Sequence, residues 1–82
     1  MEKILINLYV PSINQSFDIF VPCEMRVKSL VRLLASTIEN FSMNEYLSSF
    51  EEIICDINGN VMNQNNCLLD YNVQNGDRLL LI

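Results

Sequence analysis

The chain has 82 residues, half of them hydrophobic, with ten acidic residues, five basic residues, no histidine and a net charge of −5. This length and composition predict one globular domain over residues 1–82 and argue against disorder. The net negative charge argues against binding to nucleic acid or to an anionic membrane surface, because both kinds of binding need a basic patch. No hydrophobic run approaches the roughly 20 residues of a membrane-spanning helix. The alternating N-terminus is not typical of a signal peptide.

The three cysteines are an odd number at wide, irregular spacing. Without a Cys-x-x-Cys pair or a Cys/His cluster, the sequence predicts no zinc site. Reduced thiols in a cytoplasmic protein are the simplest interpretation. Cys55 alternates with Ile53 and Ile57, which predicts a core residue, whereas we expect Cys23 and Cys67 to be partly exposed. Whether Cys23 or Cys67 is reactive stays open.

The N-terminal third predicts an antiparallel hairpin. Hydrophobic residues alternate from Ile4 to Val10, which is typical of a half-buried strand. Residues 16–21 alternate in the same way, with Phe17, Ile19 and Val21 facing the core. The turn-forming residues 11–15 join the two strands.

Residues 26–41 predict one long amphipathic helix, without glycine or proline. Its hydrophobic stripe has helical spacing and consists of Val27, Leu30, Val31, Leu34, Ile38 and Phe41. A lone helix of this length is marginal in water, so the stripe needs a partner surface. Ser42 and Glu45 match a capping box, which predicts a short helical turn over residues 44–49 with Tyr46, Leu47 and Phe50 packing inward.

The C-terminal third predicts two more strands and several turns. Residues 51–57 form a strand with Ile53, Cys55 and Ile57 on the core face, and Asn58-Gly59 favours a hairpin with a brief return strand at 61–62. Residues 67–74 fit a tight turn that the ring and hydroxyl of Tyr71 would pin. Residues 78–82 are hydrophobic on both faces, which is typical of a central strand or of a contact surface.

The order hairpin, helix, strand, short strand, strand predicts an α+β fold. This order resembles that of the β-grasp (ubiquitin-like) fold. One long helix would pack on one face of a mixed sheet whose first and last strands are central and parallel. Residues 68–74 read Leu-Leu-Asp-Tyr-Asn-Val-Gln and resemble the ubiquitin segment between its fourth and fifth strands. Val21, Val27, Leu30 and Leu34 also have ubiquitin-like spacing, so the resemblance covers most of the chain, with extra length at 41–50.

A narrower resemblance is to the EsaB/YukD family, small ubiquitin-like proteins of bacterial type VII secretion systems. It rests on Val21-Pro22 leading toward Val27-Lys28 and on the closing segment 75–79. The resemblance implies a non-conjugated accessory or regulatory protein, acting through protein–protein interaction with cytosolic parts of a membrane-bound secretion machine. It also implies a cytoplasmic location, with recruitment to the inner face of the membrane by protein partners and no direct membrane insertion. The alternative is a generic ubiquitin-like adaptor domain in another pathway.

The sequence predicts no catalytic residue, no cofactor and no metal site. Without histidine, Ser-His and Cys-His pairs are absent, and two glycines make no phosphate-binding loop. Conjugation of the ubiquitin type requires a flexible tail that ends in Gly-Gly. The chain ends instead on the predicted strand from Leu79 to Ile82, so we expect neither conjugation nor enzymatic activity.

The predicted functional surface is the sheet face that points away from the helix. Its residues would be Leu5, Tyr9, Phe20, Ile54, Leu80 and Ile82. Ubiquitin binds partners with the corresponding face, but Asp56 aligns with its central isoleucine there, so we expect ubiquitin receptors not to recognise this protein. Three interpretations stay open: a docking surface or homodimer interface, hydrophobic residues that are scattered or covered by residues 41–50, and a wrong strand register.

Overall fold

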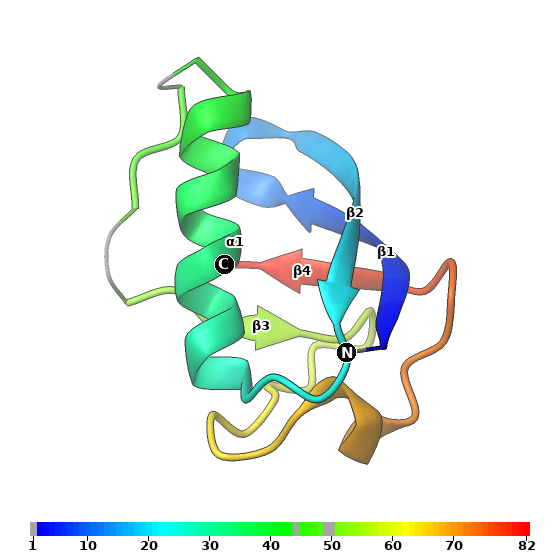
Figure 1. Cartoon of the computed structure of the whole chain (residues 1–82). Helices are drawn as coiled ribbons and strands as arrows, with labels where there is room; N and C mark the ends of the chain where they lie inside the picture. Colours follow the sequence, from blue (N-terminus) through cyan, green and yellow to red (C-terminus); the bar gives the residue numbers. More distant parts are fainter. Residues whose placement is uncertain (1, 44, 49–50) are drawn as a thin grey trace.

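The computed structural model describes residues 2–43, 45–48 and 51–82. Its elements are β1 (Lys3–Val10), the 3₁₀ turn η1 (Pro11–Ile13), β2 (Gln15–Pro22), α1 (Val27–Phe41), β3 (Ile54–Cys55), the 3₁₀ turn η2 (Leu68–Tyr71) and β4 (Arg78–Leu81). The strands form one sheet in the order β2-β1-β4-β3, and α1 lies across one face of it (Figure 1). The predicted mixed sheet with a single long helix on one face is confirmed.

The β1–β2 hairpin is paired along its whole length, from Lys3 opposite Pro22 to Val10 opposite Gln15. The tight η1 turn joins the strands and ends at Asn14, whose φ is +50°. The alternation has the predicted effect, because every second residue from Ile6 to Val10 is buried. On β2 the inward residues before Val21 are only half-buried, since this strand is at the edge of the sheet.

β1 and β4 are the central strands and run parallel, as predicted, with Leu8 beside Leu79. Two hydrogen bonds extend this pairing to the residues just before β4. Asn7 N–H donates to Asp77 O (2.9 Å), and Gly76 N–H donates to Leu5 O (2.8 Å). Gly76 has a φ of +88°, a left-handed conformation that glycine adopts without strain. The first and last strands of the chain therefore pair in the middle of the sheet.

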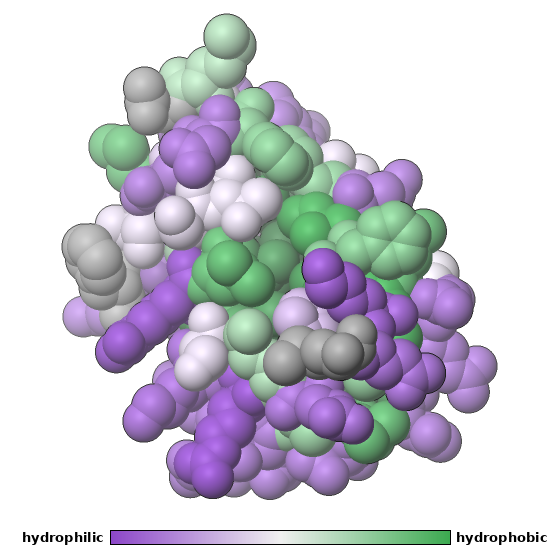
Figure 2. All heavy atoms as spheres, viewed as in Figure 1, coloured by the Kyte–Doolittle hydropathy of each residue, from purple (hydrophilic) through white to green (hydrophobic). Residues whose placement is uncertain are grey.

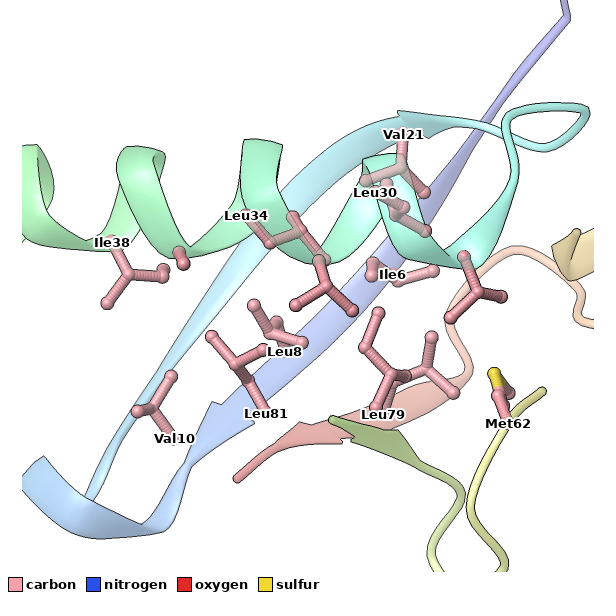
Figure 3. Close-up of a cluster of buried hydrophobic side chains, with 14 of the residues drawn as sticks. Ile6, Leu8, Val10, Val21, Leu30, Leu34, Ile38, Met62, Leu79 and Leu81 are labelled. Atoms are coloured by element: carbon pink, nitrogen blue, oxygen red, sulfur yellow. The ribbon is translucent and has the colours of Figure 1, made fainter. Parts of the chain in front are cut away.

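The hydrophobic core lies between α1 and the sheet (Figure 3). Inward side chains of β1 and β4 face the helix stripe, and the labelled members are Ile6, Leu8, Val10, Val21, Leu30, Leu34, Ile38, Met62, Leu79 and Leu81. One predicted member of the stripe is wrong: Phe41, the last helical residue, is 60% exposed, with its ring centroid 6.2 Å from that of Phe17. No helix among the described residues is long and hydrophobic enough to cross a membrane.

The start of α1 has no side-chain cap. Instead, the loop before η2 caps the helix: Val27 N–H donates to Asn66 O (2.7 Å) and Lys28 N–H donates to Gln64 O (3.1 Å). The Tyr71 hydroxyl accepts from Asn63 N–H at 2.7 Å and fixes this loop. The predicted pinning role of Tyr71 is confirmed, and it also serves the helix start.

The connection from α1 to β3 differs from its prediction. Residues 45–48 are not helical, and the Ser42 hydroxyl accepts from Tyr46 N–H (3.0 Å) rather than forming the predicted capping box with Glu45. Tyr46 is buried as expected, but Leu47 is 73% exposed. Phe50, also predicted to pack inward, lies outside the described residues. The capping-box pattern of Ser42 and Glu45 is therefore not enough by itself to form a helical turn in the described part of this connection.

A buried carboxylate fixes this connection. Glu52 is 6% exposed, and it accepts from the Tyr46 hydroxyl (2.6 Å) and from the Ser48 hydroxyl (3.0 Å). Ser48 N–H in turn donates to the Glu39 carboxylate of α1. Burial, followed by the hydrogen bond to Glu52, raises the pKa of Tyr46 well above its ordinary range. The bond from Ser48 to Glu39 thus attaches the connection to α1, and the bonds to Glu52 hold the connection together.

We expect Tyr46→Phe to lower the free energy of unfolding by about 1–3 kcal/mol, because the ring still packs while the buried Glu52 carboxylate loses a donor. Urea denaturation followed by circular dichroism measures the change. Tyr9→Phe is the matched control, since the Tyr9 hydroxyl donates to Asn14 at the surface (2.6 Å) and its loss should matter less. Equal effects of the two substitutions would contradict this role for Glu52.

Candidate functional site

The sheet face away from α1, here called the outer sheet face, contains five of the six predicted contact residues. Strand alternation and cross-strand pairing place there Leu5, Tyr9, Phe20, Leu80 and Ile82. Leu5 lies opposite Phe20, and Tyr9 lies beside Leu80. Phe20 is 66% exposed and Ile82 is 58% exposed, whereas the other three are half-buried by their neighbours. The face offers hydrophobic contact area, and its use by a partner stays a prediction.

Ile54 is the exception, and its predicted orientation is wrong. It pairs with Leu81, both residues belong to the core between sheet and helix, and Ile54 is 0% exposed. The neighbouring isoleucines at 53 and 54 fit either strand register, and a shift of one residue exchanges the faces. The pairing of β3 with β4 fixes the register. The alternation of hydrophobic residues in the sequence does not predict that pairing.

The one-residue difference between the predicted and the observed register also changes where the residues after Ile54 lie. Cys55 is buried as predicted, but it lies beside Leu80 and outside the inner core cluster, while Ile57 is 68% exposed and not a core residue. Asp56 follows the end of β3, where its carboxylate accepts from Asn58 N–H and Asn60 N–H at 2.9 Å each. These bonds, foremost that from the Asn60 backbone, hold the pKa of Asp56 below its usual range. Asp56 thus stabilises the hairpin.

A polar row crosses the outer sheet face, and the sequence did not reveal it. The Asn7 amide bridges two strands: its Nδ2 donates to Asp18 Oδ1 (3.0 Å), and its Oδ1 accepts from Arg78 Nε (2.7 Å). Arg78 also lies over the Tyr9 ring, with Cζ 5.2 Å from the ring centroid. Such cation–π contacts contribute about 0.5–1 kcal/mol at exposed sites. The row is assembled from β2, β1 and β4.

The polar row divides the hydrophobic residues of the face into two groups. Leu5 and Phe20 lie on one side of it, and Tyr9, Leu80 and Ile82 lie on the other. Because the central guanidinium is held in place by two contacts, it is oriented before any partner binds. A complementary partner surface would therefore combine apolar side chains with a hydrogen-bond acceptor for Arg78.

The cysteines and acidic residues make no second site. Cys23 is buried, so its predicted partial exposure is wrong, while Cys67 is half-exposed as predicted. The Cys67 backbone N–H donates to the Asp70 carboxylate and lowers the pKa of Asp70. Over the described ranges, no three His, Cys, Asp or Glu side chains come together in a group that could hold a metal ion.

Solved structures with this fold include ubiquitin-like domains from several kinds of organism. The ubiquitin-like domain of EccD5 from Mycobacterium xenopi superposes with a TM-score of 0.76 at 13% identity, over 100% of this chain and 94% of that one. That of the Mycobacterium tuberculosis type VII secretion protein ECCD1 gives 0.71 at 13% identity, over 100% and 99%. Ubiquitin from Caldiarchaeum subterraneum gives 0.75 at 13% identity, over 99% and 92%.

These superpositions identify a ubiquitin-like β-grasp fold, as predicted. No protein-family model matches the chain, and no curated protein matches it in sequence. At this level of identity the similarity concerns the fold alone. Function has to be argued from the surfaces of the molecule.

The corrected register of β3 can be tested by two substitutions. Ile54→Ala should lower the free energy of unfolding by about 2–5 kcal/mol, because it leaves a cavity under α1. Ile82→Ala, on the outer sheet face, should lower it by less than about 1.5 kcal/mol, because that side chain is mostly exposed. Chemical denaturation of both variants measures the difference. A larger loss of unfolding free energy for Ile82→Ala than for Ile54→Ala would instead support the register of residues 51–57 that the sequence predicted.

Proposed function

We propose that this protein is a non-conjugated accessory protein of a bacterial type VII secretion system, and that it docks onto a cytosolic part of the secretion machinery through the outer sheet face. The observation that carries the proposal is the outer sheet face itself. Exposed Phe20 and Ile82 lie on opposite sides of the polar row that contains the prearranged guanidinium of Arg78. Such a mixture of hydrophobic side chains and a fixed Arg is typical of protein-binding surfaces.

The similar ubiquitin-like domains support the choice of pathway. Two of them belong to the type VII secretion proteins EccD5 and ECCD1, and the fold also matches chains within the ESX-5 inner membrane complex and the ESX-3 core complex. In this proposal the chain acts in the cytoplasm, and its protein partners bring it to the inner face of the membrane. It would have no catalytic step, because its role is to bind.

A generic ubiquitin-like adaptor in another pathway is the second candidate. It is favoured by equally good superpositions on domains outside secretion, such as the domain of Plasmodium falciparum Dsk2, with a TM-score of 0.74 at 16% identity over 98% of this chain and 96% of that one. The neighbouring genes separate the two candidates. Genes for a membrane ATPase and for small helical export substrates would favour the secretion role.

Export by a strain that lacks the gene tests the proposal. The wild-type gene should restore the small helical substrates to the culture medium, and Leu80→Asp should not, because a carboxylate in the middle of the outer sheet face opposes an apolar contact. Immunoblots of the medium measure export, and circular dichroism of the purified variant should show a native fold.

Leu33→Asp is the matched control. Leu33 is a 46% exposed leucine on α1, on the other layer of the molecule, and its substitution should leave export intact. Full export with Leu80→Asp, or unchanged export after deletion of the gene, would contradict the proposal.

A further inference from the structure

A second surface lies along α1, on the side that faces the connection to β3 and away from β2 (Figure 1). We call it the helix groove: a cavity of about 630 Å³ between the α1 residues from Lys28 to Glu39 and the side chains of Ser48, Glu52 and Gln64. Its floor is the buried side of the helix at Val31 and Ala35. The groove is thus open, partly apolar and flanked by charges.

The other side of α1 looks different. Figure 2 shows hydrophobic surface between α1 and β2, where the half-buried Phe17 and Ile19 face the helix. Neither that strip nor the free edge of β2 has a charged counterpart that would define an occupant. The helix groove has such charged side chains, and they define the chemistry of an occupant.

Two cations lie at one end of the helix groove, and the described part of the chain gives them no partner. Lys28 and Arg32 are one helical turn apart on the same face, and neither forms a hydrogen bond or ion pair with another residue that the structure describes. The two carboxylates that line the groove accept hydrogen bonds from the connection to β3: Glu39 accepts from Ser48 N–H, and Glu52 accepts from the Tyr46 and Ser48 hydroxyls. No ion pair joins either carboxylate to Lys28 or Arg32 among the described residues, so this end of the groove presents two positively charged side chains.

The position of these cations is unfavourable for the helix. Arg26, Lys28 and Arg32 are three of only five basic residues in a chain of net charge −5. Like charges four residues apart destabilise a helix, and so do cations close to its N-terminus. The first turn of α1 contains no acidic residue that would offset them. The side chains of Lys28 and Arg32 have no hydrogen bond or ion pair among the described residues, so both remain available to pair with the carboxylates of a ligand.

The groove shape distinguishes between anionic ligands. The α1 residues that line it extend over twelve positions, from Lys28 to Glu39, which is about 16 Å at about 1.5 Å for each step along the helix. That length holds about five residues of an extended peptide, at about 3.3 Å each, and greatly exceeds one phosphate group. The amides at the helix start are already bonded to the Asn66 and Gln64 carbonyls, so the side chains would bind the anion.

We propose that the helix groove binds an extended acidic segment of a partner protein. Carboxylates of this segment pair with Lys28 and Arg32, and an intervening apolar side chain lies on Val31 and Ala35. The groove and the outer sheet face lie on opposite layers of the molecule, so this site does not rest on the proposed secretion role. A partner could occupy one surface while the other stays free.

The probe is a blocked hexapeptide of alternating glutamate and leucine, titrated into the ¹⁵N-labelled full chain and followed by NMR. Saturable shifts should centre on the amides of Arg32, Ala35 and Gln64. Arg32→Glu should weaken binding by at least about tenfold, because it replaces attraction with like-charge repulsion. Arg32→Gln should weaken it by less, which keeps the test valid if the reversed charge disturbs folding.

Lys3→Glu is the matched control. It changes the net charge by the same −2, at an exposed position on β1, and should leave the affinity within about twofold of wild type. An equal loss in Lys3→Glu would overturn the proposal, as would equal binding of a glutamine–leucine hexapeptide or absence of saturable shifts. Inorganic phosphate is titrated separately. If phosphate causes the same shifts at equal or lower concentrations than the peptide, the groove is a phosphate site and the proposed peptide site is wrong.

Discussion

The parallel pairing of β1 with β4 is the contact on which the other features of this molecule depend. It joins residues about 70 positions apart, and it places Leu79 and Leu81 beside the inward residues of β1 under α1. β2 and β3 are then added at either side as edge strands. Since a parallel pair has no local turn to guide it, α1 and the hydrophobic face it buries must supply the stabilisation.

The same pairing creates the outer sheet face. Asn7 can bridge Asp18 and Arg78 only because β1 lies between β2 and β4 in this register. The sheet therefore has one face made of hydrophobic side chains in the core and another that mixes hydrophobic residues with a fixed cation. The helix layer adds a groove with its own charge pattern. A small ubiquitin-like domain thus offers two chemically different surfaces, one on each layer.

Local patterns in the sequence predicted the elements that depend on neighbours in the chain. The helix stripe, the β1–β2 hairpin and the Asn58-Gly59 turn follow from spacing and turn chemistry. The orientation of Ile54 did not follow, because two adjacent isoleucines satisfy both registers and only the pairing with Leu81 decides. Phe41 continues the helical spacing, yet it is mostly exposed.

The features of the two surfaces could not be predicted from the sequence, because they depend on contacts between residues far apart in the chain. The row of Asp18, Asn7 and Arg78 combines three strands from both ends of the chain. The helix groove requires that the connection, held by Glu52 and Tyr46, is placed against α1. Charge counts showed an acidic protein, but only the structure shows that Lys28 and Arg32 have no acidic partner among the described residues.

Native-state hydrogen exchange measured by NMR is the most direct test of the central β1–β4 pairing. The amides of Leu8, Leu79 and Leu81 should all exchange only on global unfolding, with the free energy that denaturant unfolding gives. Exchange of the β4 amides at a clearly lower free energy than that of Leu8 would contradict the account, because the last strand would then open without the rest of the fold.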